Sequence, residues 1–188
     1  MGMIRILDSD LKLKAILRKV TSSDRTEAIN DENSLNFETF VSAKTNQYLN
    51  ADSVIELDGD YFDIAALSKT QKDNGSCVIK AETEHISYRL NDPEYNMETF
   101  AATGTPTAVL SSILAGTPFT VGTVEFSAAV TYSAAEAKSR RALLMEFAAT
   151  LGAELDFNKF QISLVAHRGN TKRKILAPNK NIKVVSQI

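Results

Sequence analysis

The stretch from Cys77 to Leu90, CVIKAETEHISYRL, carries the feature that most limits the folds open to this chain. Apolar residues alternate along it, as in a strand with one buried face, but the alternation changes phase near residues 82–85. The apolar positions are first odd and then even: Cys77, Ile79 and Ala81, followed by Ile86, Tyr88 and Leu90. Such a change indicates either a β-bulge or a strand that leaves one hydrophobic core and enters another.

We favour the second interpretation, which predicts one strand from Cys77 to Leu90 with a domain boundary at residues 91–93. The 188 residues are enough for one or two domains with real cores. The predicted division is a β-rich domain, residues 1–91, and a domain that mixes helix and strand, residues 92–188. The predicted fold class is therefore α+β.

Turn signals separate short strands throughout the first domain. Asp58 and Gly59 lie between two apolar runs, and glycine accepts the positive φ that a type I′ hairpin turn requires. Asn74 and Gly75 predict a second turn, which leads into the strand that begins at Cys77. The polar stretch at residues 22–33, SSDRTEAINDEN, is either a flexible loop or the charged side of a β-ribbon.

The tripeptide Gly-Thr-Pro occurs twice in the second domain, at residues 104–106 and 116–118. In the first copy Thr105 is a suitable N-cap and Pro106 suits the first helical position, while in the second copy Gly116 and Pro118 end the helix. A phosphate could bind at the start of this helix, but Pro106 removes one N–H donor and no lysine is near. We therefore predict a packing helix with a buried stripe: Val109, Leu110, Ile113 and Leu114.

A strand, a helix and a hairpin are predicted after it. Residues 126–132 alternate as a strand, and Ser133 with Glu136 forms a capping box for a helix that stops at Gly152. The buried stripe of that helix is Leu143, Leu144, Phe147, Ala148 and Leu151. Residues 153–157 and 160–166 then alternate around a turn at Asn158 and Lys159, and a last pair of strands, RKILA and NIKVV, surrounds Pro178 and Asn179.

Composition excludes several classes of protein. The net charge of −2 provides no basic field for nucleic acid, so no specific nucleic-acid binding is expected. The single cysteine, Cys77, allows neither an internal disulfide nor a cysteine-based zinc site. The sequence contains no apolar run long enough for a membrane-spanning helix, and its start lacks the apolar segment of a signal peptide, so we expect no membrane insertion.

No catalytic, cofactor-binding or metal-binding residues are predicted. A metal cluster of Glu82, Glu84 and His85 would need a bulge, because neighbouring strand residues point to opposite faces, and His85 is expected to be a half-exposed histidine. Cys77 lies in an apolar strand pattern and is expected to pack as a small hydrophobic residue rather than act as a nucleophile. The cluster of Asp58, Asp60 and Asp63 is typical of a turn.

Basic residues gather near the C-terminal end of the sequence. They could form a docking patch for an acidic partner or a phosphate, or they could be the solvated face of an edge hairpin, which lysine protects from further pairing. We favour the second interpretation for this set: Lys172, Arg173, Lys174, Lys180 and Lys183.

Three segments of the sequence carry a resemblance to a known family: AETEHISYRLND, GTPTAVLSSILAGTPFTVGTVEF and SAAEAKSRRALLMEFAATLGAELDFNKFQISLVAHRGN. Together they resemble the N-terminal hub region of siphophage tail-associated lysins, the prophage endopeptidase tail family, which is similar to the central baseplate hub of contractile phage tails. The earlier NSLNFETFV and SVIELDGDYFDIAAL also fit that family's opening barrel. The resemblance implies a β-barrel-like domain followed by a small α+β domain.

The resemblance also implies a function. Such proteins form a homotrimer that closes the end of the tail tube and binds the distal tail protein and other tail-tip proteins. They are made in the bacterial cytoplasm and reside at the virion tail tip. Any lytic activity is expected in a separate C-terminal region, so this chain is not expected to be an enzyme. The chain is short for a complete hub, which implies either a fragment or a reduced homologue.

Two other functions stay open on the sequence alone. One is a peptidoglycan endopeptidase or other hydrolase of a tail-associated lysin, which the family name suggests. The other is a carbohydrate-binding or receptor-binding module, which is disfavoured because tryptophan is absent and the five tyrosines are dispersed.

Overall fold

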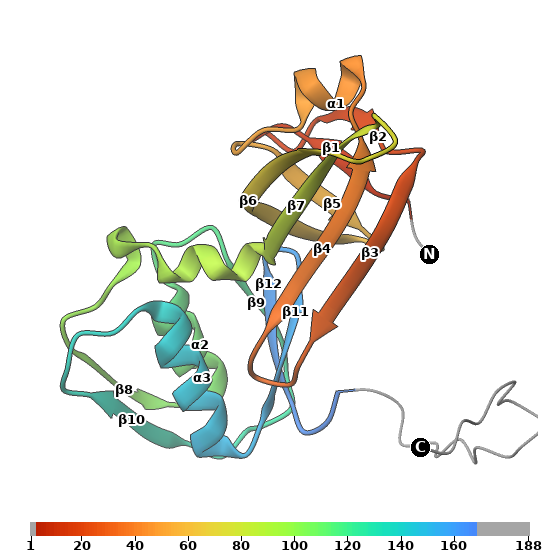
Figure 1. Cartoon of the computed structure of the whole chain (residues 1–188). Coiled ribbons are helices and arrows are strands. Elements are labelled where there is room, and N and C mark those ends of the chain that lie inside the picture. The colour runs from red at the N-terminus through yellow and green to blue at the C-terminus, as the bar shows by residue number, and fades with distance from the viewer. Residues whose placement is uncertain (1–2, 169–188) are drawn as a thin grey trace, which may run out of the picture.

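The computed structural model describes residues 3–168, and its elements form two groups (Figure 1). The first group is a large antiparallel sheet, and the second contains two helices and two smaller sheets. The basic cluster at residues 172–183 and the last predicted pair of strands lie outside the described residues.

The large sheet has seven strands in the order β2-β1-β5-β6-β7-β4-β3. All neighbours are antiparallel, and β3 and β4 form a long hairpin that extends toward the second group (Figure 1). The polar stretch at residues 22–33 therefore belongs mostly to a β-ribbon rather than to a flexible loop. The strands are β1 (Arg5–Leu7), β2 (Leu13–Ile16), β3 (Val20–Glu27), β4 (Asn33–Phe40), β5 (Val54–Leu57), β6 (Asp60–Gln71) and β7 (Cys77–His85).

The barrel-like domain that the resemblance implied is an open sheet here. Its marginal strands β2 and β3 are consecutive in the chain, yet no pairing between them is found among residues 3–168. The segment that links them makes hydrogen bonds to both sides of the sheet. The Leu17 N–H donates to the carbonyl of Ile4, just before β1, at 2.9 Å, and the Lys19 carbonyl accepts from the hydroxyl of Thr39 in β4 at 2.9 Å. The margins thus approach at this link without closing into a barrel.

Both predicted hairpin turns of the first group are confirmed. Asp58 and Gly59 join β5 to β6 with φ values of 52° and 93°, as a type I′ turn requires. Gly75, with a φ of 79°, lies in the turn between β6 and β7. One helix was not predicted: α1 (Ala43–Tyr48) is a short helix whose N-cap Ser42 and Thr45 bond reciprocally.

The phase change in the stretch from Cys77 to Leu90 has another cause than the one predicted. Strand β7 ends at His85 and keeps a single phase, because the polar residues Thr83 and His85 occupy its inward positions and are buried. The bulge lies on the partner strand β6, between Ile64 and Ala66. Beyond His85 the chain forms a 3₁₀-helix, η1 (Ile86–Asn91), so the strand predicted to reach Leu90 is wrong. The chain does pass here from one core to another, since Ile86 and Leu90 pack in the second.

Helix α2 (Pro106–Leu114) is confirmed with its caps. The Thr105 hydroxyl accepts from the Ala108 N–H at 3.3 Å, and Pro106 is the first helical residue. The four residues of the predicted stripe are buried, and Gly116 follows the helix with a φ of 79°. The repeated tripeptide thus opens and closes one packing helix.

Helix α3 (Arg140–Leu151) begins later than predicted. Its N-cap is Ser139, whose hydroxyl accepts from the Ala142 N–H at 3.1 Å, and Ser133 lies instead in a strand opposite Ala101. The predicted capping box was therefore wrong, because Ser133 is part of a paired strand. Gly152 ends the helix as predicted, with a φ of 64°, and the predicted stripe is buried except for the half-buried Leu151.

Two small sheets complete the second group. Strand β8 (Phe100–Gly104) pairs with β10 (Val130–Ala134), which starts later than the strand predicted at residues 126–132. Strands β11 (Glu154–Asn158) and β12 (Gln161–Val165) form the predicted hairpin, with its turn one residue later, at Lys159 and Phe160. Strand β9 (Thr120–Val124), which was not predicted, adds to β12 in parallel, and η2 (Pro93–Tyr95) is a single 3₁₀ turn.

Each group has its own cluster of buried apolar residues. Phe37, Ile55 and Phe62 belong to the cluster inside the large sheet. Leu110, Leu144 and Phe147 belong to the cluster beneath α2 and α3, which also includes Ile86 and Leu90. The proposed division at residues 91 and 92 stays a prediction.

Candidate functional site

His85 lies at the point where the chain leaves the large sheet. Its side chain is fully buried and packs against Phe62 of β6 and Phe157 of β11, with ring centroids at 5.6 and 5.8 Å. Its Nδ1 accepts the Ser87 N–H at 3.2 Å and so caps η1. The prediction of a half-exposed histidine was therefore wrong, because the strand keeps its phase through residue 85.

Burial controls the protonation of His85. Burial, together with the charges of Arg25 and Arg141, lowers the pKa of the imidazole to about 4, although Asp60 and Glu27 oppose this. The nearest carboxylate oxygen, Oδ1 of Asp60, lies 3.9 Å from Nε2, which has no hydrogen-bond partner among the described residues. His85 is thus neutral at pH 7 and acts as a packing and capping residue.

Arg141 of α3 also connects the two groups. It is 6% exposed, and its guanidinium carbon lies 3.9 Å from the ring centroid of Tyr88. Its nitrogens donate to the Ser87 hydroxyl at 3.1 Å and to the carbonyl of Asp31 at 2.7 Å. One buried arginine therefore connects α3, η1 and the tip of the β3–β4 hairpin.

Asn30 fixes the tip of that hairpin on the second group. Its side-chain amide donates to the Ala153 carbonyl at 2.8 Å and accepts from the Leu155 N–H at 2.7 Å. This pair of bonds imitates one step of a β-ladder beside β11. The φ of Asn30 is 53°, a conformation that asparagine accepts better than most residues.

Ion pairs extend the contact along the surface. Arg168, after β12, pairs with Glu27 of β3 and lies 2.9 Å from the carboxylate of Asp156. Arg25 of β3 lies 2.7 Å from Asp60, at the start of β6. We call His85, Arg141, Asn30 and this ion-pair network the joint. The Arg25–Asp60 pair lies within the large sheet, whereas the bonds of Asn30, the bond from Arg141 to Asp31 and the Arg168–Glu27 pair bridge the two groups.

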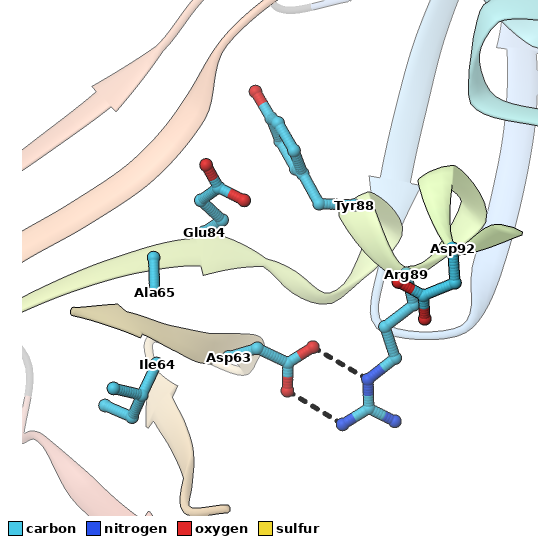
Figure 2. A pocket seen from close by; sticks show the side chains of 7 residues that line it. All are labelled: Asp63, Ile64, Ala65, Glu84, Tyr88, Arg89 and Asp92. Carbon is cyan, nitrogen blue, oxygen red and sulfur yellow. Dashed lines mark hydrogen bonds and ion pairs between the residues drawn. The ribbon is translucent and has the colours of Figure 1, made fainter. Parts of the chain in front are cut away.

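A pocket of about 290 Å³ opens next to the joint, where the bulge of β6 faces η1. Figure 2 shows Arg89 directed at Asp63 and both carboxylate oxygens of Asp63 bonded, each at 2.7 Å. The hydrogen bond with Asp63 raises the pKa of Arg89, which therefore stays charged. Asp63 thus serves as the structural ion-pair partner of Arg89.

The sequence of the large sheet matches a known domain. Residues 4–85, which contain all seven of its strands, match the profile of the prophage endopeptidase tail N-terminal domain. These residues are similar to the N-terminal domain of the prophage endopeptidase tail family. The match ends at His85, the residue at which the chain enters the joint. We use the name tail domain for residues 4–85 below.

Two crystal structures share the fold beyond the tail domain. Prophage tail protein gp18 from Listeria monocytogenes EGD-e aligns with a TM-score of 0.67 and 14% identity over 88% of this chain. The tail protein from Neisseria meningitidis MC58 aligns with a TM-score of 0.58 and 13% identity over 87% of this chain. The chain spans 50% of the length of each of these proteins. No curated protein matches the chain in sequence.

The remaining residues considered from the sequence are dispersed over the tail domain. Cys77 is exposed at the start of β7, so the prediction that it packs inside was wrong. Glu82 and Glu84 are exposed, whereas His85 on the other face is buried, and the three side chains do not converge. Asp58 lies in the β5–β6 turn, while Asp60 and Asp63 form the ion pairs described above.

Two further observations concern the described part of the chain. Among residues 3–168 no three His, Cys, Asp or Glu side chains are grouped so that they could hold a metal ion. No helix in the same range has the length and apolar character needed to cross a bilayer. His167 is exposed, with Nδ1 3.5 Å from the carboxylate of Glu154.

The residues of the joint were missed from the sequence, although one carried a signal. Arg141, Leu144 and Ala148 are spaced as one face of α3, so helical spacing places an arginine beside the buried stripe. The position of Asn30 depends on a contact with residues more than a hundred positions away, and no local pattern predicts it.

Proposed function

We propose that this chain is a structural part of the tail tip of a phage or prophage, in the baseplate hub. The observation that carries the proposal is the match of residues 4–85 to a prophage endopeptidase tail domain. The shared fold with two tail proteins over 87–88% of the chain supports it. In this role the chain assembles with itself as a homotrimer and binds the distal tail protein, so that the tail tube is closed.

The joint suits a structural role. A subunit that transmits load between neighbours needs its parts in a fixed orientation, and buried polar groups with satisfied partners provide that. Arg141 and Asn30 together make four hydrogen bonds across the joint. We propose that the chain is not itself an enzyme, that it resides at the virion tail tip, and that it binds neither nucleic acid nor membrane specifically.

Binding to the distal tail protein of the same prophage tests this proposal. The two purified proteins would be mixed and separated by size-exclusion chromatography with light scattering. We expect a complex whose mass equals a defined ratio of both proteins. Two proteins that elute separately at every concentration tested would contradict the proposed hub function.

A hydrolase is the second candidate, because the matching domain carries the word endopeptidase in its name. Incubation with purified peptidoglycan, followed by chromatography of the soluble fragments, tests it. We expect no release above buffer. Release of fragments by a preparation that is free of other hydrolases would replace the structural proposal with an enzymatic one.

A further inference from the structure

Three basic side chains of the tail domain have no partner within residues 3–168. They are Arg18 and Lys19, in the segment that links β2 to β3, and Lys44 of α1, and all three are exposed. Every other lysine and arginine in this range pairs with a carboxylate, donates a hydrogen bond or lies over an aromatic ring. The described part of the fold therefore does not use these three charges.

The three residues line one pocket. It has a volume of about 250 Å³ and lies at the link between β2 and β3, where the large sheet stays open. Among the described residues that line it there is no aspartate or glutamate. In a chain with a net charge of −2, this pocket is thus a local excess of positive charge.

Apolar side chains line the same pocket. Ala15 and Leu17 are buried, whereas Ile16 of β2 and Phe40 of β4 are 36% and 39% exposed. Removal of exposed apolar surface from water is favourable, so an occupant with an apolar group gains free energy here.

Three like charges around one pocket repel one another, and no carboxylate among its described residues offsets the repulsion. The cost to the free chain is small, because water and salt screen exposed charges. An anionic group among the three cations reverses the sign of the interaction, since each cation then attracts it. The pocket is therefore complementary to a ligand that is both anionic and apolar.

We infer that this pocket binds an acidic segment of a partner protein. One apolar side chain of the segment enters the pocket and contacts Ile16 and Phe40, while neighbouring aspartates or glutamates pair with Arg18, Lys19 and Lys44. Apolar anchors that fill pockets, with polar groups around them, carry much of the binding energy at protein interfaces. The arginine adds orientation, because its guanidinium pairs with a carboxylate through two parallel hydrogen bonds.

A protein segment fits these observations better than other anions do. Inorganic phosphate has no apolar group to cover Ile16 and Phe40, and the headgroups of a bilayer form a broad surface that does not enter a pocket of about 250 Å³. The pocket lies beside α1, at the end of the large sheet opposite the second group (Figure 1), so a partner reaches it without displacing the joint. The inference rests on the proposed function, because the partner is another protein of the tail.

Fluorescence polarisation with labelled synthetic peptides tests the pocket on the whole chain. Each peptide contains one central leucine or phenylalanine, and its flanking positions carry an increasing number of aspartates or glutamates. We expect the affinity to rise with the number of carboxylates, to fall as salt is added, and to be lost when serine replaces the central apolar residue. Failure of every peptide in the set to bind, or binding that does not depend on the carboxylates, would overturn the inference.

Two variants with the same change in net charge locate the site. The first combines Arg18→Ala, Lys19→Ala and Lys44→Ala, and we expect it to bind the acidic peptides at least about tenfold more weakly. The control should bind them as the natural chain does. It changes three exposed lysines that form ion pairs outside the pocket: Lys12→Ala, Lys72→Ala and Lys80→Ala. Equal losses in both variants would show that net charge alone attracts the peptides, which contradicts a site.

Inorganic phosphate and vesicles of phosphatidylglycerol are the competing probes. If either binds through Arg18, Lys19 and Lys44 while the peptides do not, the inference is wrong and the pocket takes phosphate or lipid instead. If no peptide binds but the complex with the distal tail protein forms, the inference fails and the proposed function stands. If the peptides bind and that complex does not form, the pocket stands and the proposed function fails.

Discussion

At the scale of single residues, polar side chains are buried where the two cores meet. His85 and Arg141 each have almost no exposure, and they lie on elements from different groups. Groups of this kind stabilise a structure while their partners remain and destabilise it strongly when one partner is removed. The joint is therefore the place where single substitutions should have the largest effects.

His85 predicts a pH dependence of stability. Its pKa is about 4 in the folded chain, against 6.5 as the ordinary value, so below pH 6.5 the unfolded chain binds a proton that the folded chain does not. The stabilisation by neutral His85 is complete above pH 6.5 and is lost as the pH falls to about 4, by about 3 kcal/mol in total. Urea unfolding at several pH values should show this slope.

The variant His85→Gln is the control for that slope, because glutamine does not titrate in this range. It should unfold with a smaller loss of stability between pH 6.5 and 4 than the natural chain does. Identical slopes in the two proteins would show that His85 is not the group responsible.

Arg141→Met should cost about 3 kcal/mol of unfolding free energy, because the Asp31 carbonyl and the Ser87 hydroxyl lose a buried charged donor. Arg5→Met is the matched control, since Arg5 makes an exposed ion pair with Glu56 at 3.1 Å and should cost less than about 1 kcal/mol. Chemical denaturation measures both. Similar losses in the two variants would count against a special role for Arg141.

At the scale of elements, the hairpin β3–β4 acts as a strap between the tail domain and the second group. Asn30→Ala should remove two hydrogen bonds and strain a positive φ, at a cost of about 2 kcal/mol. Asn30→Gly keeps the backbone conformation and isolates the loss of the bonds. Hydrogen exchange should show faster exchange at Leu155 in both variants. Unchanged exchange there would mean that the strap does not depend on Asn30.

The pairing of β9 with β12 makes a second prediction at this scale. A Cβ at Gly122 would lie 2.3 Å from the Ser163 hydroxyl oxygen and 2.8 Å from Cγ of Gln161, so Gly122→Ala should destabilise by about 1–3 kcal/mol. Adding Ser163→Ala removes the closest atom and should recover part of the loss in thermal unfolding. A double variant as unstable as the sum of its singles would contradict the predicted clash.

Elements were predicted well where local chemistry decides them. The turns at Gly59 and Gly75 and the helix between the two Gly-Thr-Pro copies depend on backbone conformations that few residues adopt, so sequence indicates them. Predictions failed where distant pairing decided, as at Ser133, which became part of β10 instead of a helix cap. The prediction of a half-exposed His85 was wrong for the same reason, because polar side chains occupy inward-facing positions of β7.

At the scale of the whole molecule, the fold was anticipated through a family resemblance more than through pattern. The β-rich first part and the mixed second part followed from periodicity, but the barrel did not appear, since β2 and β3 do not pair with each other in the described residues. The joint could not be predicted, because it unites residues from β3, β7 and α3 that are adjacent only after both groups have folded.

The proposed function requires that this chain assembles a tail-tip hub together with the distal tail protein. Native mass spectrometry of the mixed proteins tests it most directly, because it reads the number of copies of each protein in one complex. We expect a trimer of this chain bound to one ring of the distal tail protein. A spectrum that contains only the separate proteins, or one chain bound without defined stoichiometry, would contradict it.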